Sequence, residues 1–160
     1  EPGYFCRNGL RFPCPAGSYG SASRETRETC EGLCPAGYFC LEASTTPTAN
    51  LCGSEQVYCP VGSSAPRYVS VGYYTNESDP AFARTTQSRC PPGSYCTSDG
   101  LRHLCPRGTY ARHEKNTHPR CEGKCEGTHT AKTCVVEGKR AARSTLGRIL
   151  GICGFTETLL

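Results

Sequence analysis

Cysteine and histidine are the side chains whose spacing could support chemistry in this sequence, because both can ligate a metal ion. His118, Cys121, Cys125 and His129 lie close together, at a spacing that would suit a zinc site. An equivalent stretch at residues 30–34 has the same cysteine spacing but no histidine. A metal that folds a repeated module should recur in both copies. We therefore predict no metal site and no other cofactor.

Disulfide formation is the other chemistry open to cysteine. The chain has 14 cysteines in 160 residues, about nine per cent, which is typical of a disulfide scaffold. Leu, Ile, Val and Phe together make up roughly 14 per cent, too little for an ordinary apolar core. Cystines would have to stabilise the fold instead, and they indicate an oxidising compartment. We expect a secreted, extracellular or cell-surface protein.

Other functional classes lack their signatures. The sequence has no GxSxG motif, no phosphate-binding loop and no paired carboxylates, so we predict that the protein is not an enzyme.

Glu77 and Asp79 alone are too few oxygen ligands for calcium. The net charge is +4, and no basic cluster precedes residue 139, so we expect no nucleic-acid partner. No run of 18 apolar residues exists, which predicts no membrane span in this chain.

Asn76-Glu77-Ser78 is an N-glycosylation sequon. It lies in residues 75–80, whose composition is typical of a turn, so the asparagine should be exposed. In a secreted chain this predicts an N-glycan at Asn76. Thr45-Thr46-Pro47 is a weaker candidate for O-glycosylation.

The elements that position these residues are copies of one unit, Cys-Pro-x-Gly, usually followed by an aromatic residue. Proline favours turn position i+1, glycine permits positive φ, and the aromatic ring can cover a disulfide. Five copies and one partial copy occur, at residues 14–19, 34–40, 59–64, 90–96 and 105–110, and 1–6. A larger register also repeats, since the spacing of Cys6, Cys14, Cys30 and Cys34 recurs at Cys96, Cys105, Cys121 and Cys125.

This register nominates disulfides. The two fifteen-residue loops predict Cys14–Cys30 and Cys105–Cys121, each contributing about 3 kcal/mol in the chain-entropy model. Between the arrays, alternating residues predict a strand over Arg67–Thr75 with a return strand over Phe82–Thr86. We expect Cys59–Cys90 to close this hairpin. The remaining pairings stay open.

The segments CPAGSYG, CPAGYFC, CPPGSYC and CPRGTYA resemble ephrin-receptor-like cysteine-rich repeats, similar in style to tumour-necrosis-factor-receptor and growth-factor-like modules. The resemblance covers residues 1–125. Residues 63–90 are similar to spacers between such repeats in large surface proteins of protists and algae. The resemblance implies an extracellular, elongated, adhesive or structural role without catalytic residues. Residues 125–134 depart from the pattern, because they lack the proline and the aromatic residue.

We therefore predict a small disulfide-rich fold of elongated tandem modules, with short β-hairpins and little helix. The expected divisions are a first cysteine-rich array (1–58), a spacer with the hairpin (59–90), a second array (91–134) and a tail (135–160). In the tail, Leu146, Ile149, Leu150 and Cys153 share one face of a possible short helix that Ser144 could cap. The segment could be a helix that docks on the protein, a frayed tail, or a helix that lies on a membrane surface. Lys139-Arg140 could be a dibasic processing site.

Three functional hypotheses follow. The first is an extracellular structural or adhesive protein that associates with itself or with other extracellular proteins, such as a protomer of a surface filament like a flagellar hair. The second is a ligand-binding receptor ectodomain fragment. The third is a secreted disulfide-rich inhibitor. Aligning Gly3 with Gly37 places a cysteine before Glu1, so the first copy is either degenerate or part of a longer or cleaved chain.

Overall fold

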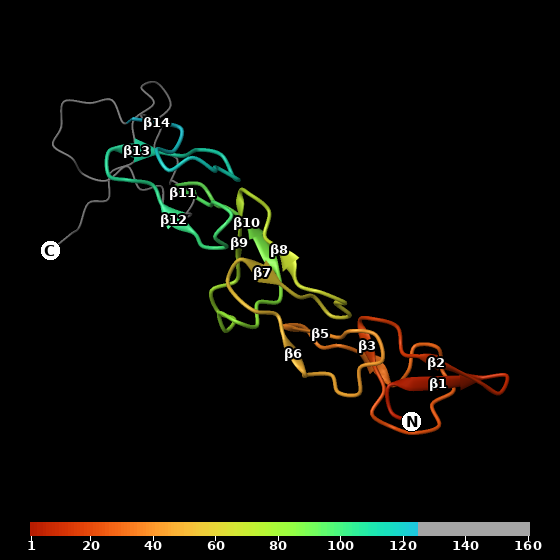
Figure 1. Ribbon diagram of the computed structural model, residues 1–160. Helices are drawn as coiled ribbons and strands as arrows, with labels where there is room; N and C mark the ends of the chain where they lie inside the picture. Colours follow the sequence, from red (N-terminus) through yellow and green to blue (C-terminus); the bar gives the residue numbers. More distant parts are fainter. Residues whose placement is uncertain (125–160) are drawn as a thin grey trace, which may run out of the picture. The chain divides into compact units, whose positions relative to one another are not determined.

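Residues 1–124 of the computed structural model are described and are drawn in colour in Figure 1. They belong to two compact lobes. Lobe 1 contains Glu1–Ser70, Tyr74–Ser88 and Ser98–Leu101. Lobe 2 contains Val71–Tyr73 and Arg89–Thr97, and it continues from Arg102. The tail helix expected around residues 144–153 lies outside the described residues and stays a prediction.

Short strands make up the regular structure of the described residues, and they pair in sequence order into seven two-stranded sheets. The pairs are β1 (Tyr4–Arg7) with β2 (Leu10–Pro13), β3 (Ser18–Tyr19) with β4 (Gly32–Leu33), β5 (Tyr38–Phe39) with β6 (Asn50–Leu51), β7 (Val57–Tyr58) with β8 (Arg67–Tyr68), β9 (Tyr73–Thr75) with β10 (Gln87–Arg89), β11 (Ser94–Tyr95) with β12 (His103–Leu104), and β13 (Thr109–Tyr110) with β14 (Gly123–Lys124). No helix occurs within residues 1–124. The prediction of a disulfide-rich fold built from short β-hairpins is confirmed.

The first strand of each pair begins in a turn that we call a turn repeat. In the repeat at residues 34–40, Cys34 is position 1, Gly37 is position 4 and Cys40 is position 7. The N–H of Tyr38 donates to the C=O of Pro35 at 3.2 Å, and Gly37 has a φ of 84°. A positive φ at the third residue is the mark of a type II turn. The carbonyl of Pro35 accepts the hydrogen bond that closes the turn, so proline occupies turn position i. The prediction that proline occupies position i+1 is wrong.

The described residues contain seven turn repeats. Five of them coincide with copies of the sequence motif, and two do not. The seven are repeat 1 (residues 1–6, without position 1), repeat 2 (14–20), repeat 3 (34–40), repeat 4 (52–59, one residue longer), repeat 5 (69–75), repeat 6 (90–96) and repeat 7 (105–111). Repeats 4 and 5 lack the Cys-Pro-x-Gly motif, so only the fold reveals them.

Two backbone hydrogen bonds join consecutive turn repeats. The N–H of position 1 donates to the C=O of position 4 in the preceding repeat, as Cys34 does to Gly17 at 3.0 Å. At the five junctions other than that between repeats 4 and 5, the N–H of position 4 donates to the C=O of position 7 in the following repeat, as Gly17 does to Cys40 at 2.8 Å. The first bond recurs from Cys14 to Gly3, Cys52 to Gly37, Val69 to Gln56, Cys90 to Gly72 and Cys105 to Gly93. Because the partners are main-chain groups, this ladder tolerates changes of side chain.

A second turn after a repeat docks back onto the repeat before it. After repeat 4, Gly62 N–H donates to Cys34 C=O at 2.8 Å, and Cys40 N–H donates to Ser63 C=O at 3.0 Å. The same two bonds occur from Ala43 to Cys14 and Gly20 to Ser44, and from Lys115 to Cys90 and Cys96 to Asn116. The Cys-Pro-Val-Gly copy at 59–64 therefore forms a docking turn and starts no strand.

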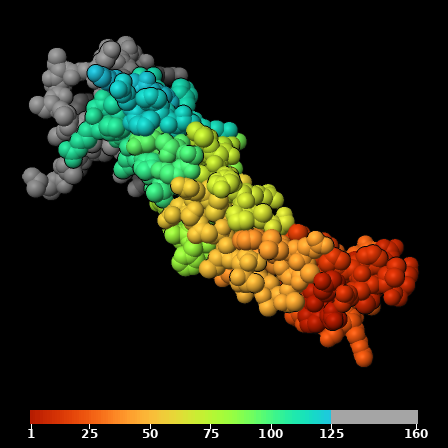
Figure 2. All heavy atoms as spheres, in the orientation of Figure 1, coloured from red at the N-terminus to blue at the C-terminus, as the bar shows by residue number. Residues whose placement is uncertain are grey.

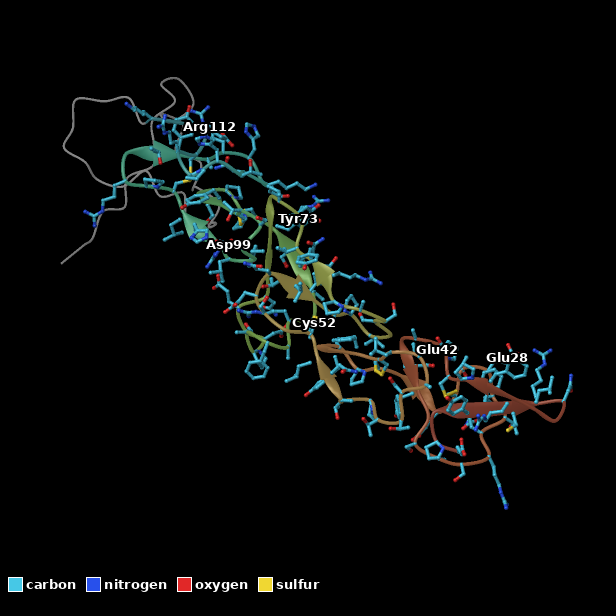
Figure 3. The ribbon with its side chains drawn as sticks, in the orientation of Figure 1. Glu28, Glu42, Cys52, Tyr73, Asp99 and Arg112 are labelled. Atoms are coloured by element: carbon cyan, nitrogen blue, oxygen red, sulfur yellow. A yellow bond between two sulfur atoms is a disulfide. The ribbon has the colours of Figure 1, made fainter. Side chains whose placement is uncertain are left out.

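Five cystines close the repeats in two ways (Figure 3 draws their sulfur atoms in yellow). The short cystines join position 1 to position 7 and are Cys34–Cys40, Cys52–Cys59 and Cys90–Cys96. The long cystines join position 1 to the following loop and are Cys14–Cys30 and Cys105–Cys121, the two pairs that the fifteen-residue loops nominate. Cys6 is exposed and has no disulfide partner among residues 1–124.

The expected Cys59–Cys90 bridge is wrong, because each of these cysteines has a nearer partner within its own turn repeat, Cys52 and Cys96. In each short cystine the two Cα atoms lie 5.8 to 6.0 Å apart, the separation a disulfide prefers. The backbone of a turn repeat thus brings positions 1 and 7 together.

The predicted strand over Arg67–Thr75 and its return over Phe82–Thr86 are also wrong. The chain forms β8, then the turn of repeat 5 at Gly72, whose φ is 83°, and then β9. The strand that pairs with β9 is β10, which starts after Thr86. The period-two pattern of valine and tyrosine belongs to a turn repeat, in which positions 1, 4 and 7 (Val69, Gly72 and Thr75) are buried and Val71 is exposed.

Sulfur replaces an apolar interior. Seven cysteines are 0% or 1% exposed, namely Cys14, Cys30, Cys34, Cys40, Cys59, Cys90 and Cys96. Few apolar side chains join them, chiefly Phe5, Val57, Val69 and Ala111. Cys14 and Cys30 contact Phe5 in one cluster. The cystines therefore provide both the covalent closure and much of the packed interior.

Candidate functional site

The sequon loop is the best-formed candidate site in lobe 1. Asn76 directly follows position 7 of repeat 5, and its side-chain Oδ1 accepts a hydrogen bond from Ser78 N–H at 3.1 Å. That bond leaves the amide nitrogen Nδ2, the atom to which an N-linked glycan attaches, outside the interaction. Asn76 is half-buried, whereas Glu77 and Ser78 are exposed. The predicted glycosylation site thus lies on a defined turn.

A buried arginine holds this loop in place. Arg84 is 5% exposed, and its guanidinium donates to the backbone carbonyls of Asn76 and Asp79. The carboxylate of Asp79 in turn accepts from the N–H of Thr85 at 3.0 Å and from its hydroxyl at 2.7 Å. The Nε atom of Arg84 has no partner in the described part of the chain. A buried cation that is bonded to loop carbonyls ties the loop shape to the interior.

Thr75 anchors the start of the loop. Its side chain is fully buried, and its hydroxyl lies 2.9 Å from the carbonyl oxygen of Glu55 and 3.1 Å from that of Gly100. Its N–H donates to the same Gly100 carbonyl at 2.8 Å. Asn76 therefore stands next to one of the most constrained residues of lobe 1.

The potential zinc ligands do not come together as thiolates. Cys121 is bonded to Cys105, so its sulfur is a disulfide sulfur. The Nδ1 atom of His118 accepts from Arg120 N–H at 3.1 Å, and Cys125 and His129 lie outside the described residues. Within residues 1–124, no three His, Cys, Asp or Glu side chains gather at metal-binding distance.

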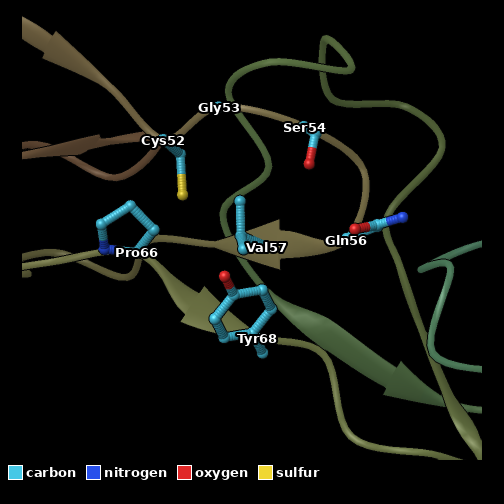
Figure 4. Close-up of a pocket in the computed structure, with 7 residues that line it drawn as sticks. All are labelled: Cys52, Gly53, Ser54, Gln56, Val57, Pro66 and Tyr68. Atoms are coloured by element: carbon cyan, nitrogen blue, oxygen red, sulfur yellow. The ribbon is translucent and has the colours of Figure 1, made fainter.

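A shallow hollow in lobe 1 lies beside β7 and β8 (Figure 4). Val57 and Tyr68 face it from the two strands, and Cys52, Gly53, Ser54, Gln56 and Pro66 complete its lining. Tyr68 is 80% exposed, and the sulfur of Cys52 is held in a disulfide. No histidine or carboxylate lines the hollow, so it offers no base that could activate the hydroxyl of Ser54. The space-filling view also shows only shallow contours on the face that it draws (Figure 2).

Two glutamates clamp the loops of the long cystines. Glu31 follows Cys30, and its carboxylate accepts from the N–H of Ser21 at 2.8 Å and from the Ser21 hydroxyl. These bonds from the hydroxyl and the N–H lower the pKa of Glu31 against a smaller effect of burial. Glu122 follows Cys121 and accepts from the N–H groups of Arg112 and His113 at 3.0 and 2.8 Å.

Burial raises the pKa of Glu122, but its hydrogen bonds together outweigh this effect and lower the pKa. The two carboxylates occupy the same place in repeats 2 and 7. Each forms hydrogen bonds to the segment that follows position 7. Their shifted titration is therefore explained by loop closure, a structural role that requires no substrate.

The described residues contain no helix long and apolar enough to cross a membrane. Comparisons with known proteins found no match, neither to a protein family, nor to a curated protein, nor to a solved structure.

Proposed function

We propose that this chain is an extracellular structural or adhesive repeat protein. The observation that carries the proposal is the ladder, in which each turn repeat is joined to the next by the same backbone bond from position 1 to position 4. Modules that contact mainly their neighbours form quasi-one-dimensional scaffolds rather than enclosed sites. The shallow hollow beside β7 and β8 fits this role better than a catalytic one.

The disulfides support the extracellular part of the proposal. Five cystines replace an apolar core in residues 1–124, and such scaffolds persist only where thiols become oxidised. Circular dichroism and urea unfolding with and without a mild reductant test this dependence. We expect reduction to abolish cooperative unfolding. A reduced protein that kept its fold would contradict the proposal.

Self-association into a filament is the specific form of scaffold that we favour. A repeat surface that docks on a different surface of a second copy generates open assemblies. Electron microscopy of the native material over a range of concentrations tests this directly. Fibres or ordered strings are expected, and dispersed monomers at the highest concentration would exclude self-assembly. A ligand-bound monomer would instead favour a receptor fragment or an inhibitor.

We also propose an N-glycan at Asn76. The support is the sequon together with the exposed turn, whose backbone carbonyl at Asn76 accepts a hydrogen bond from the buried Arg84. The protein should be secreted from a eukaryotic host and its intact mass measured before and after peptide-N-glycosidase treatment. We expect a glycan mass that Asn76→Gln and Ser78→Ala both remove. Glu77→Gln, which preserves the sequon, should retain it. An unmodified mass for the secreted wild-type chain would overturn the proposal.

A further inference from the structure

Charge is distributed unequally between the two lobes. The described residues of lobe 2 contain seven Lys or Arg and two Glu, a net charge of +5. Lobe 1 contains six Arg and nine Asp or Glu, a net charge of −3. The basic residues of lobe 2 are all exposed and are Arg89, Arg102, Arg107, Arg112, Lys115, Arg120 and Lys124. They are spread over 36 positions of the sequence, so no linear cluster reveals them.

The two acidic side chains of lobe 2 neutralise little of this charge. Glu114 lies 3.4 Å from Arg89, which it partly offsets. Glu122 is occupied by the N–H groups of Arg112 and His113 and by the His113 ring. The rest of the surface charge of lobe 2 is therefore positive.

Several of these cations are held in fixed positions. The Nζ atom of Lys115 lies 5.0 Å from the centre of the Tyr73 ring, and the Cζ atom of Arg112 lies 4.8 Å from that of Tyr110 (Figure 3 labels Tyr73 and Arg112). The backbone of Lys115 is itself fixed, because its N–H donates to Cys90 C=O at 2.8 Å in the docking turn. Because the disulfide-bonded backbone already holds these cations against tyrosine rings, their side chains lose little conformational freedom when they bind an anion.

Lys115 and Arg89 also converge on one tyrosine. Hydrogen bonds from both side chains, with that from Lys115 the larger effect, lower the pKa of Tyr73. A phenol flanked by two cations presents an aromatic face beside paired positive charge. Arginine binds sulfate and carboxylate groups through two parallel N–H groups, and lysine binds them as a point charge.

We propose that lobe 2 is a binding surface for an acidic polysaccharide, whose sulfate or carboxylate groups contact Arg89 and Lys115 beside Tyr73, and Arg112 beside Tyr110. The proposal rests on the proposed extracellular location, because acidic polysaccharides are the polyanions of that compartment. It names the adhesive partner that the proposed function leaves open.

A second copy of the chain is a poorer match for this surface. At least five of the nine acidic groups of lobe 1 have partners within that lobe. Glu1 and Glu28 pair with arginines, and Glu25 pairs with Arg27 at 3.5 Å. Glu31 and Asp79 accept hydrogen bonds from neighbouring residues. Lobe 1 therefore offers no acidic face equal to the positive charge of lobe 2.

The test uses the full oxidised chain and dextran sulfate, with uncharged dextran as the comparison. We expect calorimetric binding to dextran sulfate that weakens steeply with salt, and none to dextran. The variant Arg89→Gln/Arg112→Gln/Lys115→Gln should bind at least about tenfold more weakly, since three ion contacts are lost. The matched control is Arg24→Gln/Arg27→Gln/Arg67→Gln, which removes the same charge from lobe 1 and should bind within about twofold of wild type.

Equal weakening in both triple variants would overturn the proposal, because only net charge would then matter. An absence of binding at low salt, or equal affinity for duplex DNA, would overturn it as well. Circular dichroism of each variant confirms that the fold persists, and single substitutions at Arg112 and Lys115 provide the readout if a triple variant misfolds. This assay reads binding alone. If electron microscopy shows no filaments, the result of the dextran sulfate assay still stands. The two proposals can therefore be rejected independently of each other.

Discussion

Repeats 3 and 6 are closed by cystines, whereas repeat 5 has the same turn without one. Cys34–Cys40 and Cys90–Cys96 join positions 1 and 7, and Val69 and Thr75 stand in those positions in repeat 5. Val69 is 6% exposed and Thr75 is fully buried. The threonine hydroxyl, which lies within hydrogen-bonding distance of two carbonyls, and the packed valine substitute for the covalent link. The backbone ladder therefore specifies the turn, and a cystine is one of several ways to close it.

The largest effect should come from disturbing the glycine turn at position 4, which repeats with and without a cystine share. An added Cβ would stand 2.9 Å from a backbone oxygen in both cases, that of Ala83 for Gly37 in repeat 3 and that of Lys115 for Gly72 in repeat 5, and both glycines have positive φ. We expect Gly37→Ala and Gly72→Ala each to lower the free energy of unfolding by about 3 kcal/mol, from crowding and left-handed strain together. Urea unfolding measures both.

The control for these variants is Gly108→Ala. Gly108 has a φ of 80°, but no described atom lies within 4 Å of its added Cβ. It should lose only the strain, about 1 kcal/mol. A clear difference between Gly37→Ala and Gly72→Ala would show that the cystine alters the ladder contact itself, contrary to the comparison.

Removing a short cystine should have the next largest effect. Cys34→Ala/Cys40→Ala should reduce the free energy of unfolding by about 2 kcal/mol, because a loop with a sequence separation of 6 is freed in the unfolded chain. Urea unfolding and proteolysis monitor the variant, with Cys14→Ala/Cys30→Ala as the long-loop reference, expected near 3 kcal/mol. Loss of all strand structure would mean that the cystine, and not the ladder, shapes the turn.

Repeat 5 can be converted into a closed repeat. Val69→Cys/Thr75→Cys places cysteines at the sequence separation of 6 found in Cys90–Cys96. Closure should add about 2 kcal/mol and loss of the threonine hydrogen bonds should cost about 1, for a net gain near 1 kcal/mol. Intact mass shows whether the new disulfide forms, and urea unfolding gives the gain. Thr75→Val, which removes only the hydroxyl, should destabilise. Two free thiols in the oxidised double variant would refute the positional equivalence.

The smallest effect concerns the long-loop repeats, in which carboxylates assist closure. The pKa of Glu31 is lowered in the folded protein, so its contribution is present above its ordinary pKa and is lost as the pH falls through the folded pKa. Glu31→Gln should therefore lower the melting temperature slightly at pH 7, where the contribution is present, and flatten its fall below about pH 4.5. Glu122→Gln should behave alike. An unchanged acid profile would contradict the assigned hydrogen bonds.

Some of this was readable in the amino-acid sequence. The cysteine density predicted a disulfide-rich hairpin fold, because no apolar core was available to replace it. The two fifteen-residue loops nominated Cys14–Cys30 and Cys105–Cys121, since duplicated spacing implies duplicated pairing. The Asn76 sequon was visible as a motif, and its support by Arg84 was not, because that contact depends on how the loop folds over a buried side chain.

Only the tertiary structure decided the rest. The ladder is made of main-chain bonds, which leave little trace in side-chain identity, so repeats 4 and 5 and the docking role of residues 59–64 were hidden. The Cys59–Cys90 prediction failed because the backbone of a turn repeat holds positions 1 and 7 at disulfide distance, which pairs Cys59 with Cys52 and Cys90 with Cys96. The placement of positive charge in lobe 2 was likewise hidden, because Lys115 reaches the ring of Tyr73 only when the chain has folded.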